Sequence, residues 1–462
     1  MARTFHIRTF GCQMNEHDSE RLAGLLVADG LEPTDDMESA DVVVLNTCCI
    51  RENADNKLYG HLGWLKSLQE RRPGMQIAVG GCLAQKDGAG VRRRAGHVDV
   101  VFGTHNLARA PGLLRQAAVD GPVVEILDAP DPAGDPAHAA ALSAVREVPY
   151  LAWVTIQTGC DNSCAFCIVP QVRGPEVSRP FDDLVAEVGV LAARGVTEVT
   201  LLGQNVNSYG RDLTRRRPLF ADLLRAVGAV EGIRRVRYTS PHPKDLRPET
   251  ITAMAETPAV CEHLHLPLQS GSNRVLAEMR RGYTAERYLE RLAAARAGVE
   301  DLAVTTDIIV GFPGETEDDF ARTLEVAAAA EYDSAYTFIF SPRPGTRAAA
   351  RPELFVADDV VAERFARLRT VVERAALRRH QARVGRTEEV IVEGPSKRDP
   401  AVISGRTRQN KLVHFTPSGP APADGAYATV TITGAAPHHL RGDLLEVTAP
   451  PSTRRRIPLA VR

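Results

Sequence analysis

The sequence predicts an α/β protein in three parts: an open parallel-sheet α/β domain, a partial (βα)6 barrel and a small C-terminal β-barrel. Two observations support this fold class. Apolar strand-like runs alternate with helical patterns through most of the chain, which is typical of parallel sheets with crossover helices. After about residue 383, short β-branched runs separated by Gly and Pro replace this alternation, as in small β-barrels.

Length and composition favour a multidomain enzyme over a fibre or a disordered tail. The chain has 462 residues, of which 44% are hydrophobic and 25% are charged, and its formal net charge is −2. This length suits about three domains, each with its own core. The charge neither requires nor excludes a nucleic-acid partner. We expect domains at 1–128, 148–383 (with a trailing Arg-rich helix) and 384–450, a Pro-, Ala- and Asp-rich linker at 129–147, and a basic tail at 451–462.

The sequence also carries expectations about location. No apolar run approaches the ~20 residues that a membrane span requires, and no secretory signal opens the chain. The eight cysteines are too dilute for a disulfide framework. We therefore expect a cytoplasmic protein with free thiolates and no contact with a membrane.

The first domain is predicted to contain a parallel sheet. Strand candidates alternate with helical patterns, as expected for strands joined by crossover helices. The strands are expected at His6–Phe10, Val42–Asn46 and Ile77–Val79, and the helices at Ser19–Asp29 and Asn53–Glu70.

A cysteine follows each of these three strands within a few residues: Cys12, Cys48 and Cys82. Because ligands bind at the carboxyl ends of strands in open α/β sheets, these thiols are expected to converge on one edge. The alternative is three buried cysteines that act as small apolar side chains. Their place after the strands, beside Gly or polar residues, favours a site. Cys49 and Cys261 are interpreted as structural.

The middle segment is predicted to contain six strand–helix units, which favour a barrel-like parallel sheet. A representative helix, Phe181–Arg194, ends at Gly195, a typical C-terminal cap. The strands are expected at Leu151–Gln157, Glu198–Leu202, Arg235–Thr239, His263–Leu268, Val304–Val310 and Ala335–Phe340.

The loop after the first of these strands carries Cys160, Cys164 and Cys167 in a C-x3-C-x2-C array. Structural zinc takes four ligands, and an electron-transfer iron–sulfur cluster normally takes four cysteines. Three cysteines that hold a four-iron cluster leave one iron with an open position, where chemistry can occur. A zinc knuckle with a remote fourth ligand and three unrelated core cysteines are the alternatives.

The later strand ends carry small and polar residues that suit a cofactor site, since catalytic residues of such barrels gather there. Glycines allow close approach of the backbone, and amide groups can bind an amino acid or a ribose. We expect cofactor contacts from Gly203, Gln204, Asn205, Ser240, Gln269 and Asp307. Arg179, with Arg173 and Glu176, is either a clamp for a carboxylate or phosphate or a solvated ion-pair patch. His263 and His265 face one side of their strand, in the core or towards substrate.

The last segment is predicted to form the β-barrel, with strands that include Glu389–Glu393, Lys411–Phe415 and Ala428–Thr433. Clustered cations beside Asn410 and His414 suit a phosphate backbone and an unpaired base. An Arg-rich helical stretch from about 360 to 383 extends this basic surface. The alternative is a solvated barrel that only packs against the core. The candidate RNA-binding residues are Lys397, Arg398, Arg406, Arg408 and Lys411.

These features together resemble the radical S-adenosylmethionine (radical SAM) methylthiotransferases over nearly the whole chain. The motifs TFGCQMN, NTCCIRENA and RGPEVSRP are most similar to the branch that modifies isopentenyl-adenosine in tRNA. The resemblance implies an N-terminal auxiliary-cluster domain, a radical SAM partial barrel and a C-terminal TRAM β-barrel. It implies two 4Fe-4S clusters, an auxiliary one on Cys12, Cys48 and Cys82 and one that binds S-adenosylmethionine on Cys160, Cys164 and Cys167.

The resemblance also implies a reaction, the transfer of a methylthio group to carbon 2 of N6-isopentenyl-adenosine next to the tRNA anticodon. One S-adenosylmethionine donates the methyl group and a second is the source of a 5′-deoxyadenosyl radical. No catalytic side chain is expected beyond the cluster ligands. The implied partners are tRNA and an external flavodoxin- or ferredoxin-like electron donor, and the chain is expected to be a monomer.

Other readings remain open at this stage. A related methylthiotransferase would act on threonylcarbamoyl-adenosine in tRNA or on an aspartate of a ribosomal protein. A protein of another class would be a non-catalytic iron–sulfur or zinc protein that only binds RNA.

Overall fold

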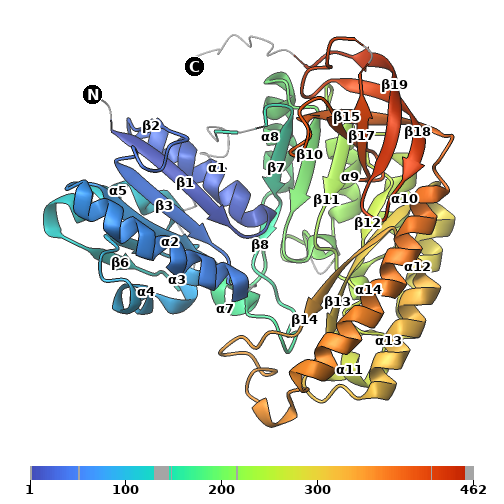
Figure 1. The fold of residues 1–462 in the computed structure, drawn as a ribbon, viewed down its shortest axis with the longest axis horizontal. Coiled ribbons are helices and arrows are strands. Elements are labelled where there is room, and N and C mark those ends of the chain that lie inside the picture. Colours follow the sequence, from blue (N-terminus) through green and yellow to red (C-terminus); the bar gives the residue numbers. More distant parts are fainter. Residues whose placement is uncertain are drawn as a thin grey trace.

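The structure is a computed structural model that describes residues 3–49, 52–128, 145–146, 148–214, 217–417 and 419–452. Three bodies follow one another along the chain: an N-terminal α/β domain, a half-barrel of strands and helices, and a C-terminal β-barrel (Figure 1). Most of the predicted linker at 129–147 and of the predicted tail at 451–462 lies outside the described residues. Among the described helices, none is both long and apolar enough to cross a membrane.

The N-terminal domain is an open sheet of six parallel strands in the order β2-β1-β3-β4-β5-β6, as the sequence predicts for its fold class. Apolar cores cover both faces of this sheet. Every residue of the central strand β3 is buried, so its side chains alternate between the two cores. The elements are β1 (Thr4–Phe10), α1 (Gln13–Ala28), β2 (Glu32–Pro33), β3 (Val42–Thr47), α2 (Glu52–Arg71), β4 (Gln76–Gly81), α3 (Cys82–Asp87), α4 (Ala89–Arg94), β5 (Val100–Phe102), α5 (Ala110–Asp120) and β6 (Val123–Glu125).

Helix α1 begins earlier than the sequence pattern indicates, at Gln13 instead of Ser19. Its first turns bury Asn15, His17 and Asp18. Buried polar residues hide the apolar period on which a sequence-based helix assignment relies. These residues contact other parts of the chain; for example, His17 Nδ1 lies 2.7 Å from Thr155 Oγ1 in the half-barrel.

The half-barrel contains the six predicted parallel strands in two sheets of three, β11-β10-β7 and β12-β13-β14. Among the described residues, one isolated bridge, between Val236 of β11 and Val260 just before β12, joins the two sheets. Strands β7 and β14 are not paired with each other, so the barrel is open on that side. The strands are β7 (Leu151–Thr155), β10 (Glu198–Leu202), β11 (Arg235–Tyr238), β12 (His263–His265), β13 (Ala303–Val310) and β14 (Ser334–Ile339). The main helices are α7 (Val169–Arg173), α8 (Phe181–Ala193), α9 (Phe220–Gly228), α10 (Pro248–Glu256), α11 (Asn273–Glu278), α12 (Ala285–Gly298), α13 (Glu317–Ala330) and α14 (Asp358–Gln381).

Strands β7 and β12 end more than one residue before their predicted ends, whereas β11 and β14 end one residue early. Strand β12 ends at His265 instead of Leu268, where Pro267 has no N–H to continue the ladder. The first strand divides after Thr155, and Gln157–Thr158 (β8) pairs antiparallel with Val177–Ser178 (β9). This short hairpin encloses the loop that carries Cys160, Cys164 and Cys167.

Side chains of the second sheet alternate between a helix-covered face and an inward face. On β13, Val304 and Ile308 are fully buried in the core that the helices share. Asp307 and Ile309 point the other way and are partly exposed. The inward face of the half-barrel is therefore available to a ligand.

The C-terminal domain is a closed barrel of five strands in the order β15-β16-β17-β19-β18, as predicted. It docks on the half-barrel through ion pairs. Fully buried Arg235 on β11 pairs with Glu389 of the barrel at 3.0 Å, and Lys411 pairs with Asp333 at 2.6 Å. The strands are β15 (Thr387–Pro395), β16 (Ile403–Thr407), β17 (Leu412–Thr416), β18 (Tyr427–Ala435) and β19 (Leu440–Ala449).

We expect Lys411→Ala to weaken the docking of the β-barrel. The change leaves the buried Asp333 carboxylate with the backbone N–H of Val304 but without its cation, a loss of about 3 kcal/mol. Hydrogen exchange of β17 should accelerate, and the thermal unfolding temperature should fall. Lys397→Ala, which removes an exposed amine from the same barrel, should change neither quantity. Equal behaviour of the two variants would refute the docking role of Lys411.

Candidate functional site

The N-terminal cysteines gather where three neighbouring strands end. Strand β3 lies between β1 and β4, and a cysteine follows each strand within two residues. The thiol of Cys12 is hydrogen-bonded with that of Cys48. The thiol of Cys82 is hydrogen-bonded with that of Cys49, a residue that the sequence indicates as structural. The edge therefore holds four thiols, one more than the sequence indicates.

Two of these thiols are poised as thiolates. The pKa of Cys12 is lowered to about 6, first by its hydrogen bond with Cys48 and also by the charge of Arg173. The pKa of Cys82 is lowered to about 7 by its hydrogen bond with Cys49 and again by Arg173. The same hydrogen bond, together with burial, raises the pKa of Cys49. Because the thiolate is the form that binds metal, Cys49 is less suited than Cys12 or Cys82 to be a ligand.

The half-barrel reaches this edge through the short helix α7, which follows Cys167 almost directly. Ile168 and Val172 pack in the same apolar core as Cys82. The guanidinium of Arg173 is 8% exposed and pairs with Asp18 of α1 at 2.8 Å. One short segment thus connects the second cysteine loop to the first cysteine set.

The second set, Cys160, Cys164 and Cys167, lies in the loop between β8 and β9, with nitrogen donors directed at two of its sulfurs. Arg281 Nη1 donates to Cys164 Sγ at 3.3 Å, and Asn162 Nδ2 donates to Cys160 Sγ at 3.4 Å. Burial raises the pKa of Cys160, and it raises that of Cys167 to about 12. Donors to the sulfurs are among the groups that tune iron–sulfur clusters, so this environment fits such a cluster.

Neither cysteine set forms a compact single-ion site. Within the described ranges, no three His, Cys, Asp or Glu side chains are close enough to share one metal ion. A four-iron cluster is larger than one ion and separates its cysteines more widely. Convergent thiols, a nearby buried cation at each set and donors to sulfur are what a negatively charged cluster requires.

Most residues predicted to contact a cofactor lie in loops at the carboxyl ends of β10, β11 and β12, and Asp307 lies within β13. Gln204 Oε1 and Asn205 Oδ1 are buried acceptors without a hydrogen-bond partner, as is Gln157 Oε1 on β8. Buried polar atoms of folded proteins are normally hydrogen-bonded. Three open acceptors close to the cysteine loop therefore fit a ligand that carries N–H or O–H donors.

Backbone geometry at two further predicted positions is consistent with a ligand site. Ser240 and Gln269 have φ of 59° and 68°, in the left-handed region that non-glycine residues seldom adopt. Gly203 has little free space, because a Cβ there would lie 2.9 Å from Gln157 Cγ. Asp307 faces inward and lies 3.4 Å from His265 Nε2.

Arg179 lies in the interior of the half-barrel, beside β7 and α8, and not among the loops at the strand ends. Its guanidinium is buried, pairs with Glu187 at 2.6 Å and donates to the carbonyl of Thr155 at 3.0 Å. Its charge is therefore already used inside the domain. Glu176, from the same motif, accepts a hydrogen bond from Ser208 at 2.7 Å.

The cations predicted to bind RNA divide into two groups. Lys397 and Arg398 are exposed. Arg406 pairs with Glu393 on the barrel, whereas Arg408 pairs with Glu262 and Lys411 with Asp333 of the half-barrel. Arg408 and Lys411 therefore dock the β-barrel, and this use of their charges differs from the predicted contact with RNA. The Arg-rich helix α14 is also paired with carboxylates, through Arg364–Glu315, Arg367–Glu317, Arg369–Glu373 and Arg378–Glu331.

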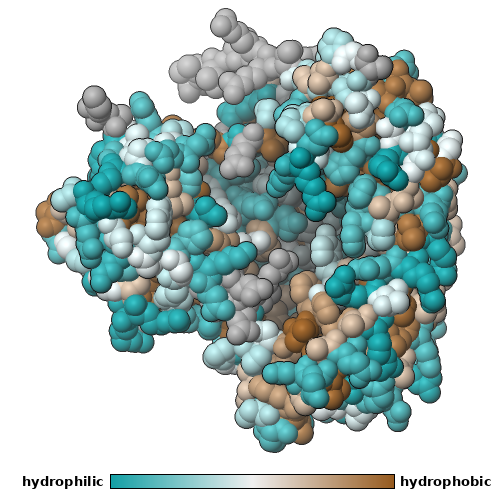
Figure 2. Space-filling model, viewed as in Figure 1, coloured by the Kyte–Doolittle hydropathy of each residue, from teal (hydrophilic) through white to brown (hydrophobic). Residues whose placement is uncertain are grey.

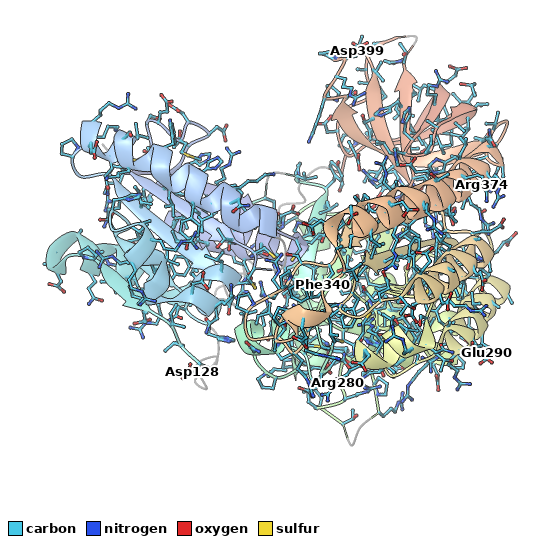
Figure 3. The ribbon with its side chains drawn as sticks, turned by 60° about the horizontal axis from the view of Figure 1, so that its bottom comes forward. Asp128, Arg280, Glu290, Phe340, Arg374 and Asp399 are labelled. Carbon is cyan, nitrogen blue, oxygen red and sulfur yellow. The ribbon has the colours of Figure 1, made fainter. Side chains whose placement is uncertain are left out.

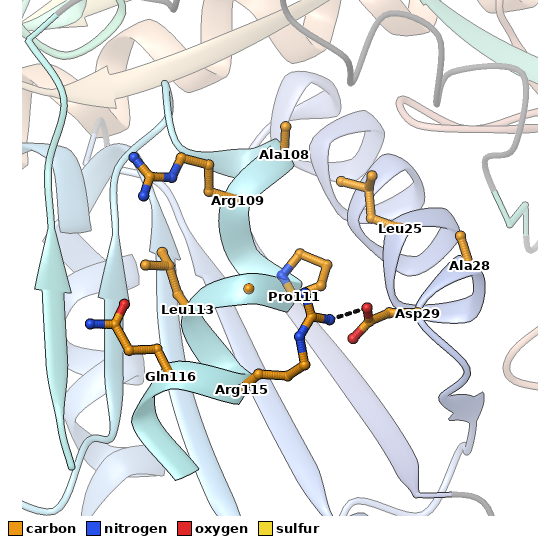
Figure 4. A pocket seen from close by; sticks show the side chains of 10 residues that line it. Leu25, Ala28, Asp29, Ala108, Arg109, Pro111, Leu113, Arg115 and Gln116 are labelled. Carbon is orange, nitrogen blue, oxygen red and sulfur yellow. Dashed lines mark hydrogen bonds and ion pairs between the residues drawn. The ribbon is translucent and has the colours of Figure 1, made fainter. Parts of the chain in front are cut away.

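A hollow of about 530 Å³ in the N-terminal domain lies between α1 and α5 and is lined by Leu25, Arg109 and Pro111 among others. Arg115 and Asp29 form an ion pair across it (Figure 4). None of the predicted site residues lines it.

Three family models match consecutive parts of the chain. Residues 4–103 match Uncharacterized protein family UPF0004, residues 154–327 match the Radical SAM superfamily, and residues 381–445 match the TRAM domain.

Curated relatives match almost the whole chain. The chain is 54% identical over 445 residues to the tRNA-2-methylthio-N(6)-dimethylallyladenosine synthase of Acidothermus cellulolyticus, which covers 96% of this chain and 88% of that protein. It is 51% identical over 463 residues to the synthase of the same name from Mycolicibacterium smegmatis, with 98% of this chain and 88% of that protein covered.

A solved structure has a similar fold over about three quarters of the chain. The radical S-adenosylmethionine methyltransferase TsrM from Kitasatospora setae superposes with a TM-score of 0.55 at 15% identity. The match covers 76% of this chain and 77% of that protein.

We expect Arg173 and Asp18 to shift the reduction potential of a cluster on the N-terminal cysteines in opposite directions. Arg173→Gln removes a positive charge beside the thiolates, so the potential should fall by an amount on the order of tens of millivolts. Asp18→Asn removes a negative charge and should raise it. The measurement is an EPR-monitored redox titration with Cys160, Cys164 and Cys167 replaced by Ala. Shifts in the same direction would indicate mere structural damage.

Cys49 and Cys82 should differ in their effect on iron content. We expect Cys82→Ala to reduce iron and sulfide after anaerobic reconstitution from about eight to about four of each per chain, because one cluster loses a ligand. Cys49→Ala, which changes a thiol of the same pair, should retain the full content. Loss of iron in Cys49→Ala would contradict this prediction, because it would show that Cys49 is itself a cluster ligand.

Proposed function

We propose a function on the premise that this chain belongs to the family of tRNA-2-methylthio-N(6)-dimethylallyladenosine synthases. It transfers a methylthio group to carbon 2 of N6-isopentenyl-adenosine next to the anticodon of tRNA. The observation that carries this proposal is the presence of two three-cysteine sets on adjoining domains, connected by α7. An enzyme that joins sulfur to an unactivated carbon needs both a radical source and a sulfur source.

The cysteines hold two 4Fe-4S clusters in this proposal. Cys160, Cys164 and Cys167 hold the cluster that binds S-adenosylmethionine, and Cys12, Cys48 and Cys82 hold the auxiliary cluster. When bound, these cofactors supply the radical, the sulfur and the methyl group. Arg281 and Asn162 donate to the sulfurs of Cys164 and Cys160. Arg173 offsets the negative charge of Cys12 and Cys82.

The loops at the strand ends hold S-adenosylmethionine in this proposal. The open acceptors of Gln204 and Asn205 suit the amino group and hydroxyls of that cofactor. Gly203, Ser240, Gln269 and Asp307 complete the subsite. Arg179 supports it from below by holding the carbonyl of Thr155, without contacting the cofactor.

The remaining task of the protein is to position the target and exclude other reactions. Carbon 2 of adenine has no acidic proton and no leaving group, so a general base or a nucleophile cannot activate it. The protein accelerates the reaction by holding this carbon close to both clusters. The contact between His17 of α1 and Thr155 of β7 holds the N-terminal domain against the half-barrel beside this site.

The exposed Lys397 and Arg398 contact the phosphate backbone of tRNA in this proposal, and Arg406 contributes from β16. Electrons come from a flavodoxin- or ferredoxin-like protein. The chain works as a monomer in the cytoplasm.

Nucleoside mass spectrometry tests the activity. We expect the reconstituted protein, with S-adenosylmethionine and reductant, to add a methylthio group to isopentenyl-adenosine in tRNA under anaerobic conditions. Cys164→Ala should abolish both 5′-deoxyadenosine and product, whereas Cys82→Ala should retain 5′-deoxyadenosine only. A methylthio adduct on threonylcarbamoyl-adenosine or on ribosomal protein, with none on isopentenyl-adenosine, would show that the proposed substrate is wrong.

A further inference from the structure

An aromatic ring stands exposed on the inward face of the half-barrel. Tyr336 lies on β14 directly opposite Asp307 of β13, so the two side chains share the inward face. Its side chain is 56% exposed. The molecule is hollowed between the N-terminal domain and the other two (Figure 2), and Phe340, which follows β14, lies towards the N-terminal domain (Figure 3).

Three polar side chains, His265, Thr305 and Asp307, lie beside this ring and contact one another. The rings of His265 and Tyr336 meet edge to face, with centroids 6.2 Å apart. His265 Nδ1 lies 2.9 Å from Thr305 Oγ1, and His265 Nε2 lies 3.4 Å from Asp307 Oδ2. The wall therefore offers one flat apolar face next to a row of hydrogen-bonding groups.

The ring also lies close to the cysteine loop. Ile309 is the next inward residue after Asp307, about 7 Å further along β13. It packs with the cluster that includes Ala165 and Phe166, which stand between Cys164 and Cys167. A flat ligand on Tyr336 would thus lie on the side of the half-barrel that faces the loop of Cys160, Cys164 and Cys167.

We propose that Tyr336 is the stacking platform for the target purine base, with His265 and Asp307 facing the polar edge of that base. The proposal rests on the proposed function and names the subsite of its substrate. An unpaired base next to the anticodon can be inserted without opening a duplex. Stacking on an aromatic side chain is a principal way in which proteins hold such a base.

A single exposed aromatic residue is ordinary on a protein surface. Tyr336 differs because it lies on the inward face of its strand and its ring contacts His265. The imidazole of His265 is in turn held by Thr305 and Asp307. Asp307 borders both this platform and the proposed cofactor subsite. Since S-adenosylmethionine also carries an adenine, the test must separate the two bases.

The test combines a change of the ring with a change of the base. Stem–loop RNAs carry either isopentenyl-adenosine or an abasic residue at the position 3′ of the anticodon, and their affinities are measured by fluorescence anisotropy. We expect Tyr336→Ala to weaken binding of the first RNA about 5- to 100-fold and to leave the abasic RNA unchanged. Tyr336→Phe should restore the affinity, because the ring remains.

Ile339→Ala is the matched control, since it removes a side chain of similar exposure from the other face of the same strand. Equal losses for both RNAs, or for both variants, would overturn the proposal. A raised KM for S-adenosylmethionine in RNA-free 5′-deoxyadenosine formation by Tyr336→Ala would also overturn it, because the ring would then hold the cofactor. If the wild-type protein forms no methylthio product, the proposed function fails separately.

Discussion

A buried ion pair between Arg173 and Asp18 connects the two domains that carry cysteines. The geometry of the candidate site depends on it, because Arg173 ends the short helix that follows Cys167. Burial of two charges is costly unless both are well compensated. Here the guanidinium also lies in the field of the thiols of Cys12 and Cys82. A cluster on those thiols is negatively charged, so the arginine that docks the domains also stabilises the site that they form.

Ion pairs fix the third domain in a similar way, with a different consequence for function. Arg235, Arg408 and Lys411 join the β-barrel to the half-barrel. Cations engaged in this way are not free for phosphate. One charged side of the barrel therefore contacts the half-barrel, whereas Lys397 and Arg398 are exposed to solvent. RNA that contacts those two residues would approach from the exposed side of the barrel.

The sequence predicted features that depend on local patterns. Alternating apolar runs located the strands, and their topology predicted that Cys12, Cys48 and Cys82 meet at one edge. The roles of charged residues were harder to predict, because their partners are remote. Arg173 and Asp18 are 155 residues apart, and Lys411 and Asp333 are 78 residues apart. The contact between Cys49 and Cys82 could not be predicted for the same reason, because it arises only in the fold.

Both cysteine sets have a buried arginine from a separate element beside them. Arg281 reaches Cys164 from the segment after α11, and Arg173 approaches Cys12 and Cys82 from α7. Three thiolates around a cluster leave an excess of negative charge, and the desolvation cost of that charge rises as the site closes to water. A guanidinium remains charged at any accessible pH. Each arginine therefore lowers the cost of excluding water from its site. Exclusion of water limits side reactions, so that a radical can react with its target first.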